Sequence, residues 1–324
     1  MKQSNQKLKL LYLMKFFLEK TDEEHPATIA DMISYLSKCD ISAERKSLYD
    51  DVECLRLFGL DIVCEKKKQT FYYIASRDFE LPELKLLVDS VQASKFVTHK
   101  KSLELIAKLE GLTSSHNAGK LHHQVHLTNR TKTPNEQIYY NVDKIHDAIA
   151  RGKQIAFKYF EWTVSKEKHY RKDGEKYIEN PVALTFDDEN YYLITYKEKY
   201  KSYVHYRVDK MENIEILEND REIPEKDFDP ALYTKKVFSM FAGEEKQTVL
   251  KCKNRLINVI IDRFGKDTHI SKINENYFKA IINIEVSPQF LGWILSFGEE
   301  MEILDPDDVR KKISDLVNSI KKLY

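Results

Sequence analysis

Apolar residues recur at helical spacing through the first 58 residues, which predicts three amphipathic helices. The first ends near Lys20, and the second follows an N-cap at Thr28. The third runs from 42 to 58 and stops at Gly59. Only a short turn separates the second helix from the third, which is typical of a helix-turn-helix unit that reads the major groove of DNA.

After this third helix the pattern changes to two short strands, 61–65 and 70–74, which predicts a β-hairpin. We interpret residues 1–76 as a winged helix-turn-helix DNA-binding domain, with base contacts from the third helix and phosphate contacts from the hairpin tip. The candidate DNA-binding residues are Arg45, Lys46, Ser47, Tyr49, Lys66, Lys67 and Lys68. The alternative is a small packed domain whose lysines are merely solvated.

Residues 77–140 form a connecting region. Two apolar stripes predict two helices that link neighbouring domains or pair with a second copy of the chain. From 113 to 137 the sequence turns polar and is predicted to be a loop. His122 and His126 stand four apart, a spacing that suits a metal on a helix, but no further ligand lies at a recognisable spacing. We therefore expect no metal site.

Short strands follow one another closely after a capped helix at 141–151. They are predicted at 154–159, 176–180, 182–185, 191–196, 203–208 and 213–217. So many short strands must close or pack to protect their edges, so residues 141–220 are predicted to form a small barrel. Alternation along 203–208 places Tyr203, His205 and Arg207 on one face, which suits a phosphate or a nucleobase.

The C-terminal region, 235–324, follows the order strand, helix, strand, strand, helix, strand. This order predicts a ferredoxin-like unit. We expect Asp305 to cap a last helix whose first position is Pro306. The whole chain is thus predicted to be an α+β multidomain protein.

Composition limits the possible functions. The 324 residues carry a formal net charge of zero, so any DNA binding must come from local basic patches. There is no apolar run long enough for a membrane span, and the four cysteines are widely spaced, which favours a cytoplasmic location without a membrane partner. With nine glycines and no phosphate loop, nucleophile elbow or catalytic cluster, we expect neither an enzyme nor a bound cofactor.

Three stretches carry a family resemblance. Tyr191-Tyr192-Leu193 and the run 207–211, Arg-Val-Asp-Lys-Met, resemble the signature of the WYL domain. Residues 41–52 resemble the recognition helix of DeoR-type regulators, and residues 290–306 resemble the extension that follows WYL domains. The resemblance implies a small Sm/SH3-like barrel that senses a ligand beside a DNA-binding head.

The resemblance also implies a nucleic-acid or nucleotide-like effector for the barrel. The candidate effector-binding residues are Arg207 and His205, supported by Tyr203, Tyr159, Tyr177 and Tyr191. Tyr192 and Leu193 are expected to be core residues. For Arg207, effector binding and an ion pair with Asp209 or a neighbouring acid remain open alternatives.

Together these features predict a sequence-specific DNA-binding regulator, bacterial in type, that binds double-stranded DNA as a homodimer and whose operator affinity an effector changes. Activation and repression are equally compatible with it. The alternative is a nucleic-acid-binding accessory protein that acts through the barrel instead of at an operator.

Overall fold

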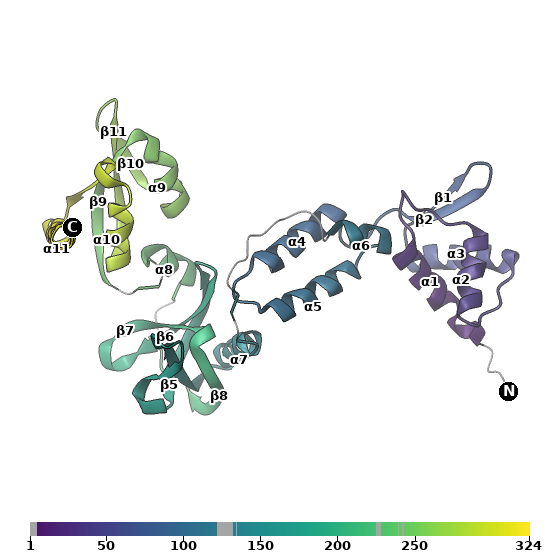
Figure 1. The fold of residues 1–324 in the computed structure, drawn as a ribbon, viewed down its shortest axis with the longest axis horizontal. Helices are drawn as coiled ribbons and strands as arrows, with labels where there is room; N and C mark the ends of the chain where they lie inside the picture. The colour runs from purple at the N-terminus through teal and green to yellow at the C-terminus, as the bar shows by residue number, and fades with distance from the viewer. Residues whose placement is uncertain (1–4, 122–131, 134, 225–227, 239, 242) are drawn as a thin grey trace. The chain divides into compact units, whose positions relative to one another are not determined.

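The structure is a computed structural model that describes residues 5–121, 132–133, 135–224, 228–238, 240–241 and 243–324. The chain divides into two compact units, Met1–Glu136 and Gln137–Tyr324, and each is described by itself. Figure 1 follows their helices and antiparallel strands along the chain.

The first unit begins with three helices and a β-hairpin, as the sequence predicts. After a 3₁₀ turn at Asn5–Leu8, the elements are α1 (Lys9–Lys20), α2 (Ile29–Lys38), α3 (Arg45–Phe58), β1 (Ile62–Lys66) and β2 (Thr70–Ile74). Side chains from every one of these helices and strands bury into one core. Ala27 forms an antiparallel bridge with Tyr72, so the segment before α2 joins the hairpin. We call residues 5–74, which hold these elements, the head of the first unit.

The ends of α2 and α3 show how far local sequence decides helix boundaries. The predicted cap of α2 is confirmed, because Thr28 Oγ1 accepts a hydrogen bond from the Asp31 N–H at 3.3 Å and the Asp31 carboxylate accepts one from the Thr28 N–H at 2.8 Å. The prediction that α3 starts at residue 42 is wrong by three residues. Ile41, 2% exposed, is anchored in the core, and an extended segment up to Glu44 places it there.

Three further helices complete the first unit: α4 (Leu81–Ala93), α5 (His99–Glu110) and α6 (Ser115–Leu121). They share a small core of Leu84, Val88, Ile106 and Leu121. The first two helices are confirmed, whereas α6 lies where a loop was predicted. The hydroxyl of Ser114 accepts a hydrogen bond from the Asn117 N–H at 3.1 Å and so caps this helix. Residues 122–131, with both histidines of the suggested metal pair, lie outside the described residues.

The second unit opens with one helix and a curled antiparallel sheet. Its elements are α7 (Ile138–Arg151), β3 (Lys153–Trp162), β4 (Lys168–Tyr170), β5 (Tyr177–Asp187), β6 (Asn190–Lys197), β7 (Ser202–Arg207) and β8 (Met211–Asp220). The strand order is β4-β3-β5-β6-β7, and β8 also pairs with β3. Because β3 pairs with three strands along its length, the sheet curls on itself, with α7 packed against it (Figure 1).

Two details of this sheet differ from the prediction. The separate strands predicted at 176–180 and 182–185 form one strand, β5, whose register shifts between Pro181 and Ala183. Proline lacks the N–H that a ladder needs, so an irregularity rather than a break occurs at that point. The short β4 was not predicted, because three residues give no periodic signal.

The C-terminal part of the second unit holds a four-stranded antiparallel sheet. Its elements are α8 (Pro230–Lys236), β9 (Glu244–Lys253), α9 (Ile257–Phe264), β10 (His269–Lys272), β11 (Tyr277–Val286), α10 (Pro288–Leu295), β12 (Met301–Asp305) and α11 (Asp307–Lys321). The strand order is β10-β11-β9-β12. Leu250, Ile260 and Phe290 belong to the core that the helices and sheet share.

The last helix begins later than predicted. Pro306, expected at the first helical position, instead occupies the N-cap with an extended backbone, and Asp305 ends strand β12. Asp307 and Asp308 take the first turn, where carboxylates suit the positive end of the helix dipole.

Among the helices of the described residues, none is both long and apolar enough to cross a bilayer. The longest, α11, has 15 residues, fewer than the roughly 20 that a span needs.

Candidate nucleic-acid and effector interfaces

The outward face of α3 carries an arginine and a tyrosine that hold one another in place. Arg45 Nε donates a hydrogen bond to the Tyr49 hydroxyl at 2.9 Å, and its guanidinium carbon lies 5.9 Å from the centre of that ring. Lys46 is exposed beside them. The N-terminal half of α3 therefore presents two cationic groups and a phenol, all donors that suit base edges or phosphates.

Ser47 is directed differently from its neighbours on α3. Its hydroxyl donates to the Glu44 carbonyl at 3.0 Å and accepts a hydrogen bond from Lys9 Nζ at 3.1 Å. The same lysine forms an ion pair with Asp51 at 2.6 Å. Ser47 therefore links α3 to α1. It does not lie with Arg45 and Tyr49 on the outward face of α3, where the sequence pattern placed it.

The hairpin tip holds the three predicted lysines, all exposed. Lys67 Nζ lies 2.6 Å from a carboxylate oxygen of Glu65, so part of its charge is neutralised locally. Lys66 and Lys68 flank it. The hairpin tip is therefore less cationic than three lysines suggest, and Lys66 and Lys68 are the residues there that suit a phosphate best.

Helix α8 and the segment before it cover the face of β7 that the sequence singled out. The Tyr203 ring centre lies 4.6 Å from that of Phe228 and 5.4 Å from that of Tyr233. His205 Nε2 lies 3.0 Å from the Tyr233 hydroxyl oxygen. Tyr203 and His205 are thus brought together, but they contact protein in this conformation and are not an open surface.

Burial sets the charge state of this covered face. It lowers the pKa of His205 and raises the pKa of Tyr233. Both changes favour the neutral forms. The contact between β7 and α8 is therefore a hydrogen bond between two neutral rings.

Arg207 is held by an ion pair. Its Nε and Nη2 donate to the two carboxylate oxygens of Asp209 at 3.0 and 2.9 Å, and Nη2 also donates to the Asn190 side-chain oxygen at 2.8 Å. A bidentate pair of this kind fixes the guanidinium plane. The structure thus contains the ion pair that the sequence left open, and an effector would meet an arginine already engaged.

Tyr159 and Tyr177 lie inside the curled sheet, 7% and 8% exposed. Their rings pack with Phe157 and Tyr206, whose centres lie 5.1 to 6.5 Å from them and from each other. Burial raises the pKa of Tyr159 to about 12, and its hydroxyl accepts a hydrogen bond from the Arg207 N–H at 3.3 Å. These two supporting candidates are therefore core residues.

Two cations that sequence reasoning missed lie over those tyrosines. The Arg171 guanidinium carbon lies 5.6 Å from the Tyr159 ring centre, and Lys172 Nζ lies 4.0 Å from that of Tyr177. Lys158 Nζ is 5.8 Å from the Tyr170 ring centre nearby. We name Lys158, Arg171 and Lys172 the cationic cap. Its signal in the sequence is the mixture of basic and aromatic residues between 158 and 177.

The signature tyrosines of β6 separate by face. Tyr192 and Leu193 are 8% and 0% exposed, so the prediction that they are core is confirmed. Tyr191 lies on the face of β6 opposite to Tyr192, with its ring centre 5.0 Å from that of Phe186 on β5. It therefore stands apart from Tyr203 and His205.

Potential metal and thiol chemistry is limited in the described residues. They contain no group of three or more His, Cys, Asp or Glu side chains that could hold a metal ion. The four cysteines are free thiols, and burial raises the pKa of Cys252 to about 12, which makes it a poor nucleophile.

Comparisons with known proteins find two domain families, both within the second unit. The WYL domain family matches residues 140–216, and the WCX domain family matches residues 248–320. Among solved structures, proteasome accessory factor B/C (PafBC) of Arthrobacter aurescens is 17% identical with a TM-score of 0.28, over 98% of this chain and 48% of that chain. This chain thus spans about half the PafBC chain. A CRISPR Cas-related protein is 12% identical with a TM-score of 0.37, over 75% of this chain and 71% of that chain. No curated protein matches the chain.

Proposed function

For a chain that carries a WYL domain followed by a WCX domain, we propose a sequence-specific DNA-binding transcriptional regulator whose WYL domain senses a nucleic-acid or nucleotide-like effector. The head reads duplex DNA, and the effector changes its affinity for an operator. The protein acts in the cytoplasm by binding and not by catalysis.

The observation that carries this proposal is the arrangement of the head. Helices α2 and α3 follow one another across a short turn, and the hairpin packs on the same core as a wing would. The isolated bridge between Ala27 and Tyr72 supports this interpretation, because a winged helix pairs a short segment with its hairpin at this point. Arg45 and Tyr49 project from the part of α3 that enters the major groove in such units.

The curled sheet supports the effector part of the proposal. We infer an Sm/SH3-like barrel whose end is covered by the cationic cap, with Arg207 beside it. Cations stacked on aromatic rings at a sheet edge suit phosphates and bases, because they combine charge with planar surfaces. A bound phosphate would recruit Lys158 and Lys172 first, since Arg171 is paired with Glu161 and Arg207 with Asp209.

We assign the C-terminal sheet to a ferredoxin-like unit, supported by the strand order β10-β11-β9-β12 with helices α9 and α10 between its strands. A homodimer would match the two-fold symmetry of a palindromic operator. Effector binding would then act by linkage, with a coupling free energy of about 1–3 kcal/mol.

A second candidate function is an accessory protein that binds single-stranded nucleic acid through the barrel. The cationic cap favours it, together with the half-exposed Trp162 on the neighbouring strand β3. Salt-sensitive binding of single strands by an Arg45→Ala variant that no longer binds duplex would assign separate roles to the barrel and the head.

Fluorescence anisotropy with a labelled mixed-sequence duplex tests the proposal on the full chain. We expect binding at low salt that weakens steeply as salt rises, and Lys68→Ala should reduce the slope of log K against log salt by about one. Arg310→Ala, which removes an exposed arginine from α11, is the matched control and should leave the slope unchanged. Absence of duplex binding at low salt would contradict the proposal.

A further inference from the structure

A cavity of about 470 Å³ lies where the β5–β6 hairpin, α8 and α9 meet. Its polar lining consists of Asp187 and Thr185 from β5, Thr234 from α8 and Arg263 from α9. The WYL domain supplies the first two, and the WCX domain supplies Arg263. Its size lies within the range of pockets that hold small organic ligands.

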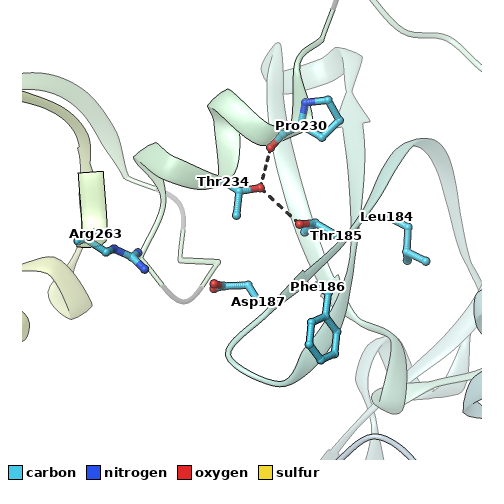
Figure 2. A pocket seen from close by; sticks show the side chains of 7 residues that line it. All are labelled: Leu184, Thr185, Phe186, Asp187, Pro230, Thr234 and Arg263. Atoms are coloured by element: carbon cyan, nitrogen blue, oxygen red, sulfur yellow. Dashed lines mark hydrogen bonds between the residues drawn. The ribbon is translucent and has the colours of Figure 1, made fainter. Parts of the chain in front are cut away.

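Asp187 and Arg263 face one another across this cavity (Figure 2). Both side chains are described, and in the described structure no ion pair joins them, although their charges influence one another. Burial raises the pKa of Asp187, and the Arg263 charge opposes that rise. Two opposite charges that face one another across the cavity without an ion pair leave room for a ligand that contacts both.

Two residues outside the lining, Val237 and Phe238, fix Arg263. Its guanidinium carbon stacks 4.2 Å from the Phe238 ring centre, and Nη2 donates to the Val237 carbonyl at 3.2 Å. Its Nε is buried without a hydrogen-bond partner in the part of the chain that the structure describes. A donor that is rigid, buried and unsatisfied costs free energy until an acceptor reaches it.

The charge pattern restricts the ligand. An anion such as phosphate alone would be repelled by Asp187, and a simple cation would be repelled by Arg263. The ligand must offer hydrogen-bond donors to the carboxylate and acceptors to the guanidinium. Phe186 adds no stacking surface here, because its ring packs against Tyr191 on the opposite face of the sheet.

We propose that this junction cavity binds a guanine base, as the free nucleoside or in an unpaired strand. Guanine carries N1–H and N2–H₂ donors on one edge, which match Asp187, and O6 and N7 acceptors on another, which match Arg263. Adenine lacks this pattern, because its edges place donors and acceptors differently.

The occupied cavity would tie α8 and α9 to the barrel. Thr234 Oγ1, which donates to the Pro230 carbonyl at 2.6 Å, also lies 3.4 Å from Thr185 Oγ1, so a base between these walls contacts α8 directly. Tyr233, next on α8, contacts His205 on β7. The site does not depend on the proposed DNA-binding function, since a chain that selects no operator can still bind guanosine.

Isothermal titration of the full chain with guanosine, inosine and adenosine tests this inference. We expect saturable binding of guanosine, binding weaker by about tenfold for inosine, which lacks the 2-amino donor, and no saturable binding of adenosine. Titration with a short single strand that contains one deoxyguanosine shows whether the cavity also binds the base within a strand. Absence of saturable guanosine and single-strand binding up to millimolar concentration, or equal binding of adenosine, overturns the proposal.

Variants assign the contacts. Asp187→Asn should weaken guanosine binding by about 10- to 100-fold, because the carboxylate accepts two donors of the base. Asp188→Asn is the matched control: it is exposed on the adjacent turn at φ 45°, which asparagine tolerates, and should change the affinity less than about twofold. An Asp187→Asn variant with unchanged melting temperature and unchanged guanosine affinity overturns the assignment.

Discussion

The Nε2 atom of His205 lies 3.0 Å from the hydroxyl oxygen of Tyr233, and this contact joins strand β7 to helix α8. The strand belongs to the WYL domain, whereas the helix leads into the WCX domain. The face that the sequence assigned to an effector is thus covered by the segment that connects the two domains. A ligand that requires His205 must displace α8 or bind at its edge.

This contact predicts a stability change with pH. Burial lowers the pKa of His205 below its usual value near 6.5, so below about pH 6.5 the unfolded chain binds more protons at this residue than the folded chain. The free energy of unfolding should therefore fall as the pH decreases from about 6.5, until the pH passes the lowered pKa. Melting temperatures between pH 7.5 and 5 measure this change.

His205→Gln is the control, because glutamine keeps a hydrogen-bonding side chain but does not titrate. Subtracting its pH profile removes contributions from other groups, including Glu285, whose pKa is raised by burial. The variant should lose part of the slope below pH 6.5. An identical slope in both proteins would show that His205 does not titrate on unfolding.

Arg207→Ala should destabilise the second unit as well as abolish any effector response. The change leaves the Asp209 carboxylate without its bidentate partner, at a cost on the order of 1 kcal/mol for a partly exposed pair. Arg207→Lys keeps the charge but loses the planar fork and should recover part of the loss. Urea titration measures the free energy of unfolding. A midpoint in the alanine variant as high as in the wild type would show that the ion pair does not stabilise the protein.

A buried carboxylate joins the head to α6 in the first unit. Asp22 accepts hydrogen bonds from the hydroxyl of Ser114 and from the N–H of His25, the latter at 2.9 Å. Burial alone would raise the pKa of Asp22, but these hydrogen bonds and the nearby His25 charge outweigh burial and lower it. Ser114→Ala should therefore cost about 1–3 kcal/mol at neutral pH.

The stabilisation is present above the usual carboxyl pKa near 4 and is lost as the pH falls through the lowered pKa, because the folded carboxyl then takes up its proton. The difference between Ser114→Ala and wild type should accordingly shrink in acid. Ser115→Ala, at the adjacent exposed position, is the control and should change little. Equal melting temperatures for both variants would contradict this role of Ser114.

Two glycines should respond oppositely to alanine. A Cβ on Gly243 would lie 2.3 Å from the Val286 carbonyl oxygen. The backbone would have to move to relieve this clash, which should lower the free energy of unfolding by about 1–3 kcal/mol. At Gly292, inside α10, nothing lies within 4 Å of such a Cβ. Gly292→Ala should stabilise the protein by about 0.5–1 kcal/mol through helix propensity. Thermal unfolding of both variants checks the contrast, and similar shifts would refute it.

Local signals predicted much of this fold and long-range contacts decided the rest. The capping box at Thr28 and the left-handed stop at Gly59 need only neighbouring residues, so they could be read directly. Helix α6 could not, because Ser114 is held by Asp22, 92 residues away. The start of α3 depends likewise on the burial of Ile41 in the core.

The candidate sites show the same division. Alternation correctly separated Tyr203 and His205 from Tyr206, which is buried in the sheet. The same alternation along β3 places Tyr159 with the buried Phe157 and could have marked it as core. Nothing local indicates that α8 covers β7 or that Arg263 faces Asp187, because these residues meet only in the folded chain.

Selection from a pool of randomised duplexes by the full chain, with Arg45→Ala selected in parallel, tests whether the head reads a specific DNA sequence. We expect enrichment of one palindromic sequence by the wild type and its loss in the variant, because the Arg45 guanidinium would contact base edges in the major groove. Recovery of no preferred sequence by the wild type, or of the same sequence by both proteins, would contradict it.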